Sequence, residues 1–148
     1  MQDDMITRQR ARPGVGKSDA HQVLLPAGWP RPAGYANGMK ARGEFVFVGG
    51  MVGWDTEQRF PSGFVAQARQ ALANIVAVLR EGGAEPKHLV RMTWYVRDMD
   101  EYLSCRDALG AAYREIIGAH YPAMALVEVS RLAEPEACLE IEATAVIP

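Results

Sequence analysis

The segment 138–147 alternates between two kinds of side chain, and this pattern constrains the fold more than any other in the chain. One set is wholly apolar: Leu139, Ile141, Ala143, Ala145 and Ile147. The intervening set includes two carboxylates, Glu140 and Glu142. Because successive side chains of a strand point to opposite faces of a sheet, helices must cover the apolar set. Both carboxylates then lie on the other face, roughly 7 Å apart at twice the rise of a strand.

Two amphipathic patterns can supply the covering helices. In residues 64–79, apolar side chains at three- and four-residue spacing predict a helix that Ser62 caps and Gly82 ends. These side chains are Phe64, Ala68, Ala71, Leu72, Ile75, Val76 and Leu79. A second helix is expected after Asp98 or Asp100, ending at Gly118. Its apolar side would carry Leu103, Ala108, Leu109, Ala112 and Ile116.

Three further segments predict strands. These are residues 45–48, residues 89–96, where Leu89 falls on the face opposite Met92, and residues 123–129. The resulting order of β, α, β, α, β, β predicts an α+β domain with two helices on one face of a mixed sheet. The other face needs another cover, and a neighbouring subunit is the natural one.

The length of the chain sets the number of domains. A chain of 148 residues, 49% of them hydrophobic, can bury one core and is too short for two. Residues 1–20 are polar and are expected to form a flexible tail, so residues 21–148 form the domain. Residues 14–18 partly match a phosphate-binding loop, but Ala11 replaces the first glycine of that motif. Prolines and glycines in residues 25–40 predict an irregular lead-in.

Charge and cysteine content exclude several classes of function. A net charge of −2 and a pI near 5.9 provide no basic patch for nucleic acid. No apolar run approaches the ~18 residues of a membrane span, and no signal-peptide pattern is present, so a cytoplasmic protein is expected. The two cysteines form no CxxC pair, and the three histidines stand singly. Neither a metal site nor a cofactor is therefore predicted.

Six short motifs between Pro30 and Val146 form a recognisable set. They are residues 34–38 (Gly-Tyr-Ala-Asn-Gly), 45–50 ending in a glycine pair, 67–74 with Gln67, Gln70 and Asn74, 121–123 (Tyr-Pro-Ala), 127–129 (Val-Glu-Val) and 140–143 (Glu-Ile-Glu-Ala). Together they resemble the RidA/YjgF family, also labelled endoribonuclease L-PSP. The resemblance implies a chorismate-mutase-like mixed sheet with two helices on one face, assembled into a homotrimeric barrel. Strands of two chains would line each ligand pocket.

The resemblance also implies roles for particular residues. Glu140 matches the family's water-positioning glutamate and is the expected catalytic residue, and Tyr35 matches the pocket tyrosine. Three positions depart from the pattern. Met124 stands where deaminating members have an arginine that grips the substrate carboxylate, so that charge-assisted contact is missing. Leu126 replaces a small polar residue or cysteine, and Met51 replaces a glutamine.

The expected substrate-binding set is therefore Tyr35, Met124, Leu126 and Met51, with Arg131, or alternatively Arg106, as the replacement cation. The first hypothesis is a hydrolytic deaminase of a reactive enamine or imine, with an aminomuconate-type compound as a fitting substrate. The second is a non-catalytic trimer that binds a small metabolite, which the adaptable methionine surface favours. Ribonuclease activity is disfavoured by the absence of a basic patch.

Overall fold

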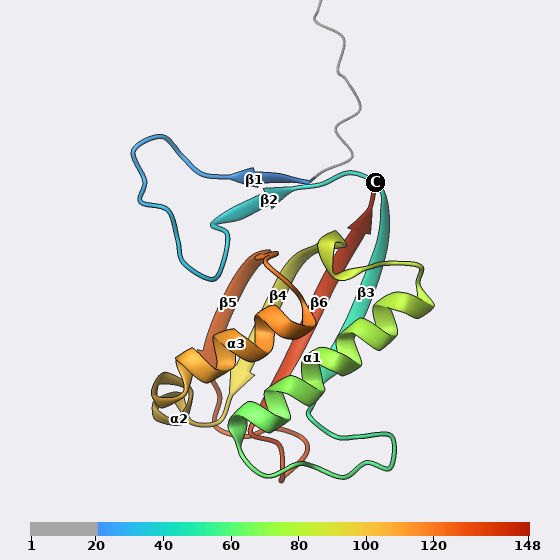
Figure 1. Ribbon diagram of the computed structural model, residues 1–148, viewed down its shortest axis with the longest axis vertical. Coiled ribbons are helices and arrows are strands. Elements are labelled where there is room, and N and C mark those ends of the chain that lie inside the picture. Colours follow the sequence, from blue (N-terminus) through green and yellow to red (C-terminus); the bar gives the residue numbers. More distant parts are fainter. Residues whose placement is uncertain (1–20) are drawn as a thin grey trace, which may run out of the picture.

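The computed structural model describes residues 21–148 (Figure 1). The tail expected over residues 1–20, together with its segment 14–18, lies outside the described residues. The expected strands and the first expected helix are found within the described range, whereas the second expected helix is divided into two.

A four-stranded mixed sheet forms the centre of the fold. Its spatial order is β3 (Glu44–Met51), β6 (Leu139–Ile147), β4 (Leu89–Val96) and β5 (Ala123–Glu128). β6 runs antiparallel to both of its neighbours, whereas β4 and β5 are parallel. Strand β5 is therefore one edge of this sheet, and β3 is the other.

Both long helices cover the same face of the sheet (Figure 1). They are α1 (Phe64–Glu81) and α3 (Arg106–Ile116). The core between them and the sheet includes fully buried side chains such as Leu72, Ile75 and Ile141. Burying a side chain of this size stabilises the fold by roughly 1.5–3 kcal/mol. The predicted apolar side of β6 is confirmed as the core side, since Leu139, Ile141, Ala143 and Ala145 are buried.

The first predicted helix is confirmed, but its cap is different. All seven residues of the predicted stripe are buried on α1. The N-cap is Gly63 rather than Ser62, and no side chain caps the helix. Instead, buried Gln67 secures this end, because its amide donates to the carbonyls of Pro61 and Glu136 and accepts from the N–H of Cys138.

The second predicted helix is two helices. The chain forms α2 (Met99–Ser104) and α3, which meet at Cys105. Asp98 caps α2 as expected by accepting from the N–H of Glu101 at 3.0 Å. The predicted continuous stripe is wrong, because Leu103 on α2 and Ala108 on α3 are both exposed. At about 100° per residue, neither position lies on the side of Leu109 and Ala112 that faces the sheet.

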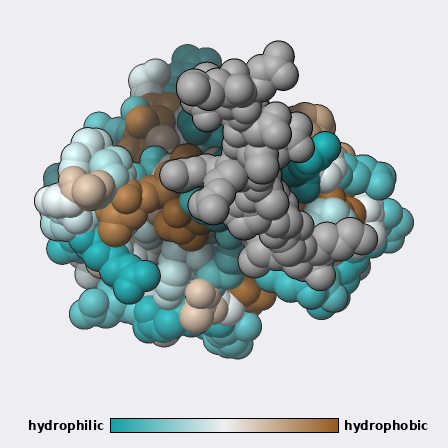
Figure 2. Space-filling model, turned by 90° about the horizontal axis from the view of Figure 1, so that it is seen from above, coloured by the Kyte–Doolittle hydropathy of each residue, from teal (hydrophilic) through white to brown (hydrophobic). Residues whose placement is uncertain are grey.

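Two local features of the strands also differ from expectation. Leu89 is buried on the core side together with Met92, because the pairing of β4 with β6 shifts between Leu89 and Arg91. The lead-in contains a short antiparallel pair, β1 (Gln22–Leu24) and β2 (Gly38–Lys40). Figure 2 looks down on the end of the molecule near this pair and shows hydrophobic patches on a largely hydrophilic surface.

Within residues 21–148, no helix covers the face of the sheet away from α1 and α3, here called the open face, although Val146 on that face is buried. Phe45 and Phe47 of β3 lie there, 56% and 74% exposed, with their rings stacked at 5.9 Å. Glu140 and Glu142 of β6 lie on the same face, as predicted, opposite Tyr95 and Thr93 of β4.

Among the described helices, none has the length and apolar character needed to cross a membrane.

Candidate functional site

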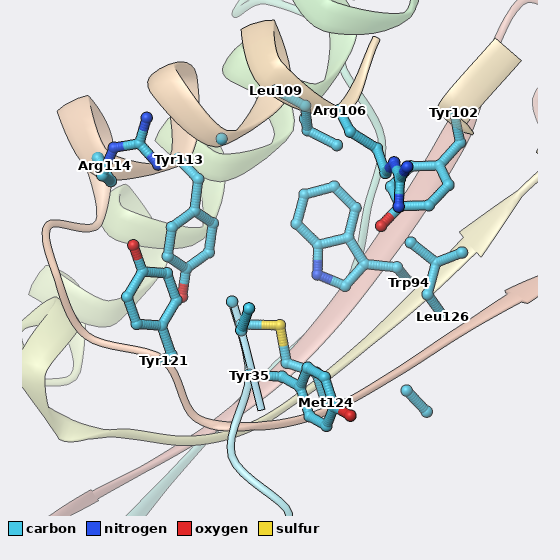
Figure 3. Close-up of a pocket in the computed structure, with 14 residues that line it drawn as sticks. Tyr35, Trp94, Tyr102, Arg106, Leu109, Tyr113, Arg114, Tyr121, Met124 and Leu126 are labelled. Atoms are coloured by element: carbon cyan, nitrogen blue, oxygen red, sulfur yellow. The ribbon is translucent and has the colours of Figure 1, made fainter. Parts of the chain in front are cut away.

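A cavity of about 500 Å³ lies between helix α3 and the edge strand β5 (Figure 3). Its volume is within the range of ~300–1,000 Å³ that is typical of small-molecule sites. Three of the residues expected from the sequence line it: Tyr35, Met124 and Leu126. The structure thus brings these three side chains together.

The register of the parallel strands explains why Met124 and Leu126 face this cavity. Met124 is aligned with Met92, and Leu126 is aligned with Trp94. Aligned residues of neighbouring strands point to the same face, and Met92 and Trp94 are buried on the helix side. Because β5 is the last strand of the sheet, its helix-side residues are only partly covered by α3 and remain accessible.

Aromatic side chains form most of the remaining wall. They come from five parts of the chain: Tyr35, Trp94, Tyr102, Tyr113 and Tyr121. The rings of Tyr113 and Tyr121 stack with centroids 5.4 Å apart. The Tyr113 hydroxyl donates to the carbonyl of His120 at 2.7 Å, and burial followed by the nearby Tyr121 raises the pKa of Tyr113 well above its usual value. Tyr113 is therefore a fixed, neutral part of the wall.

The same cavity has two cationic side chains and one buried donor. Arg106 and Arg114 line it from helix α3. Trp94 is only 5% exposed, and its Nε1 has no hydrogen-bond partner within residues 21–148. Figure 3 shows this nitrogen on the side of the ring that faces Met124 and Tyr121. A buried donor without a partner is uncommon in folded proteins.

Glu140 lies on the open face, whereas the side chains of Met124 and Leu126 lie on the helix face. The Glu140 carboxylate occupies the space that Gly50 leaves free, since a Cβ at Gly50 would collide with Oε1 of Glu140. The neighbouring Glu142 accepts a hydrogen bond from the Tyr95 hydroxyl at 2.8 Å. This bond raises the pKa of Tyr95, and desolvation and the negative charge of Glu142 add to the effect.

The other two expected residues do not line the cavity. Met51 is on β3, at the opposite edge of the sheet from β5, where it is aligned with Ile141 and packs against the core. Arg131 is exposed in the loop after β5. Arg106, the alternative cation, is a lining residue.

Sequence reasoning did not select Trp94, Tyr102, Tyr113 or Arg114. One signal was present, because Arg106, Gly110 and Arg114 follow one another at four-residue spacing and so lie near one another along a helix.

Both cysteines are partly buried, and burial is the main cause that raises the pKa of each thiol. Within residues 21–148, no three His, Cys, Asp or Glu side chains are grouped so that they could hold a metal ion.

Comparisons with known proteins agree with this fold. The family model described as Endoribonuclease L-PSP matches residues 30–147. A RutC family protein of Pyrococcus horikoshii is 33% identical over 127 residues, which is 84% of this chain and 96% of that protein. A 2-iminobutanoate/2-iminopropanoate deaminase of Escherichia coli is 35% identical over 86 residues, 58% of this chain and 66% of that enzyme.

A solved structure of a Rid family protein from Yersinia pestis gives the same result. It superposes with a TM-score of 0.71 at 32% identity, covering 85% of this chain and 98% of that chain. With the family model covering most of the chain, the comparisons establish that this protein belongs to the RidA/YjgF family.

Proposed function

We propose that the protein is a hydrolytic deaminase of a reactive enamine or imine, with an aminomuconate-type compound as its substrate class. The observation that carries this proposal is the placement of Glu140, whose carboxylate is set against Gly50 on an accessible sheet face. The relative from Escherichia coli, a deaminase of small imino acids, supports the same type of reaction.

In the proposed reaction, Glu140 accepts a proton from water while the water oxygen bonds to the imine carbon. The resulting carbinolamine collapses as its carbon–nitrogen bond breaks. Glu140 returns the first proton to the nitrogen as the carbinolamine forms. In the collapse, the hydroxyl proton passes through Glu140 to the same nitrogen, so ammonia leaves and the carbon becomes a carbonyl. No change in oxidation state is involved, so the step needs only water and a carboxylate.

The carboxylate and the cavity lie on opposite faces of one sheet, so they do not converge within one chain. We infer that the protein forms a trimer in which the open face of one subunit lies against the β5 edge of the next. Each site would then combine Tyr35 and the aromatic wall of one chain with Glu140 of its neighbour. The exposed Phe45 and Phe47 on the open face support such an interface.

The test is the variant Glu140→Gln, assayed for ammonia release from imines generated in the assay. Loss of a general base lowers the rate by ~10² to 10⁴, and we expect this loss with the assembly unchanged. Glu142→Gln is the matched control on the same strand face, because its amide oxygen can still accept from Tyr95. An unchanged rate for Glu140→Gln would rule out the proposed mechanism.

The same variant tests the shared site. Glu140→Gln trimers are mixed and reassembled with Tyr35→Ala trimers, which lack the pocket tyrosine. If each site draws on two chains, some sites in mixed trimers contain both intact groups and activity returns. No recovery after subunit exchange would place both groups in a site within one chain.

The second candidate function is non-catalytic binding of a small metabolite by the same trimer. Met124 favours it, because a thioether at this position cannot anchor a substrate carboxylate as a guanidinium can. This alternative would be supported over the deaminase if the protein binds a ligand and the Glu140→Gln variant turns over substrate at the same rate as the unaltered chain.

A further inference from the structure

We propose that Arg106 and Arg114 bind the two carboxylates of an elongated, unsaturated dicarboxylate, whose middle lies among the aromatic side chains of the cavity. The identity of this ligand as the imine to be hydrolysed rests on the proposed function. The binding site itself is argued from the cavity.

The charge of the cavity is the first argument. Its lining includes two guanidinium groups and no carboxylate. Neither Arg106 nor Arg114 makes an ion pair or a side-chain hydrogen bond within residues 21–148, although Arg59 and Arg69 pair with nearby acids. Both cations are exposed at the border of the cavity and are therefore free to form charge-assisted hydrogen bonds with an anion.

The spacing of the two arginines is the second argument. They are eight residues apart on α3, which corresponds to about 12 Å along the helix axis. Figure 3 shows them at opposite ends of the cavity, with Leu109 and Tyr113 between them. An extended six-carbon diacid spans roughly 6 Å between its carboxylate carbons, and each arginine contact adds about 2.8 Å. The total of about 12 Å is comparable with the separation of the two positions on α3, and the flexible arginine side chains can adjust their ends to such a molecule.

Gly110 shows how Arg114 is accommodated. It stands in the interior of α3, where glycine costs about 1 kcal/mol relative to alanine. A Cβ at this position would be 3.2 Å from Nη1 of Arg114. The missing side chain leaves room for the guanidinium to lie back over the preceding turn, toward the middle of the cavity and toward Arg106.

The wall between the arginines suits a flat, conjugated chain. Planar groups pack well against aromatic faces, and the rings of Tyr35 and Tyr121 are accessible in the cavity. The unpartnered Nε1 of Trp94 adds a hydrogen-bond donor between the two cationic ends. An unmade hydrogen bond at a buried donor is costly, and a polar atom on the ligand would complete it.

The experiment measures binding of trans,trans-muconate and of sorbate to the full chain by calorimetry. Sorbate has the same diene chain with a methyl group in place of one carboxylate. We expect muconate to bind about 10-fold more tightly than sorbate, the value of one charge-assisted hydrogen bond. Arg106→Met and Arg114→Met should each weaken muconate binding about 10-fold. The exposed Arg80 lies outside this cavity, so Arg80→Met should bind like the unaltered chain.

Three results would overturn the proposal: no muconate binding to the unaltered chain, equal binding of muconate and sorbate, or an arginine variant that binds muconate normally. Ammonia release is measured separately. Arginine-dependent muconate binding without deamination would leave the dicarboxylate site standing and refute the deaminase. Deamination of other imines, with no muconate binding that depends on the arginines, would support the deaminase and refute the dicarboxylate site.

Discussion

Gly50 and Glu140 depend on each other at the scale of single residues. Gly50 belongs to the stretch of β3 where pairing with β6 is irregular, between Val48 and Met51. Its missing side chain is what lets the Glu140 carboxylate lie close to the backbone of the neighbouring strand. A glycine within a strand often marks such a close approach.

This contact predicts that Gly50→Ala displaces the carboxylate without unfolding the protein, because the clashing atom is the end of a flexible side chain. A displacement of about 1 Å can lower a rate ~10²-fold, so deamination should fall far more than stability. Gly49→Ala is the matched control, since a Cβ there has no neighbour within 4 Å in the described chain. Equal activity of the two variants, measured by ammonia release, would contradict the proposed role of Glu140.

At the scale of elements, the short 3₁₀ helix η1 (Pro86–His88) contains a pH-dependent cap. Nδ1 of His88 accepts a hydrogen bond from the backbone N–H of Glu85 at 3.0 Å. Protonation removes this acceptor. The pKa of His88 is lowered, first by burial and then by the charge of Lys87. The folded state therefore binds protons less readily than the unfolded state, whose histidine pKa is about 6.5.

The sign of this shift makes a prediction about stability. The contribution of His88 to the free energy of unfolding is fully present above about pH 6.5. It is lost as the pH falls through the lowered folded-state pKa. Urea unfolding should show His88→Ala to be less stable than the unaltered chain by about 1 kcal/mol near neutral pH, the value of a cap. This difference should shrink in acid. A difference that is constant across pH would show that His88 contributes only by packing.

The elements also show what could be predicted from the sequence. Helix α1 was predictable because its buried stripe is continuous, and β6 because its alternation is uninterrupted. The break at Cys105 was not, since no glycine or proline stands between Leu103 and Asp107 to mark it. Burial depends on what the sheet places beneath each turn, which local spacing does not encode.

The candidate site was predictable only in part, for a similar reason. Tyr35 and Met124 belong to short motifs, so the resemblance located them. Trp94 gave the signal of an ordinary buried strand residue, and it lines the cavity because β4 lies next to the edge strand β5. Arg106 and Arg114 depend in the same way on where α3 crosses that edge.

At the scale of the whole molecule, the uncovered open face makes the last prediction. A large exposed aromatic pair such as Phe45 and Phe47 usually marks a protein interface, and the predicted cover is another copy of the chain around a closed threefold axis. Light scattering should give three times the chain mass of 16.2 kDa. Phe47→Asp should dissociate the trimer, because a buried unpaired carboxylate is costly. Leu103→Asp, at an exposed apolar residue on α2, should leave it intact. A stable monomer of the unaltered chain at micromolar concentration would contradict both the trimer and the shared site.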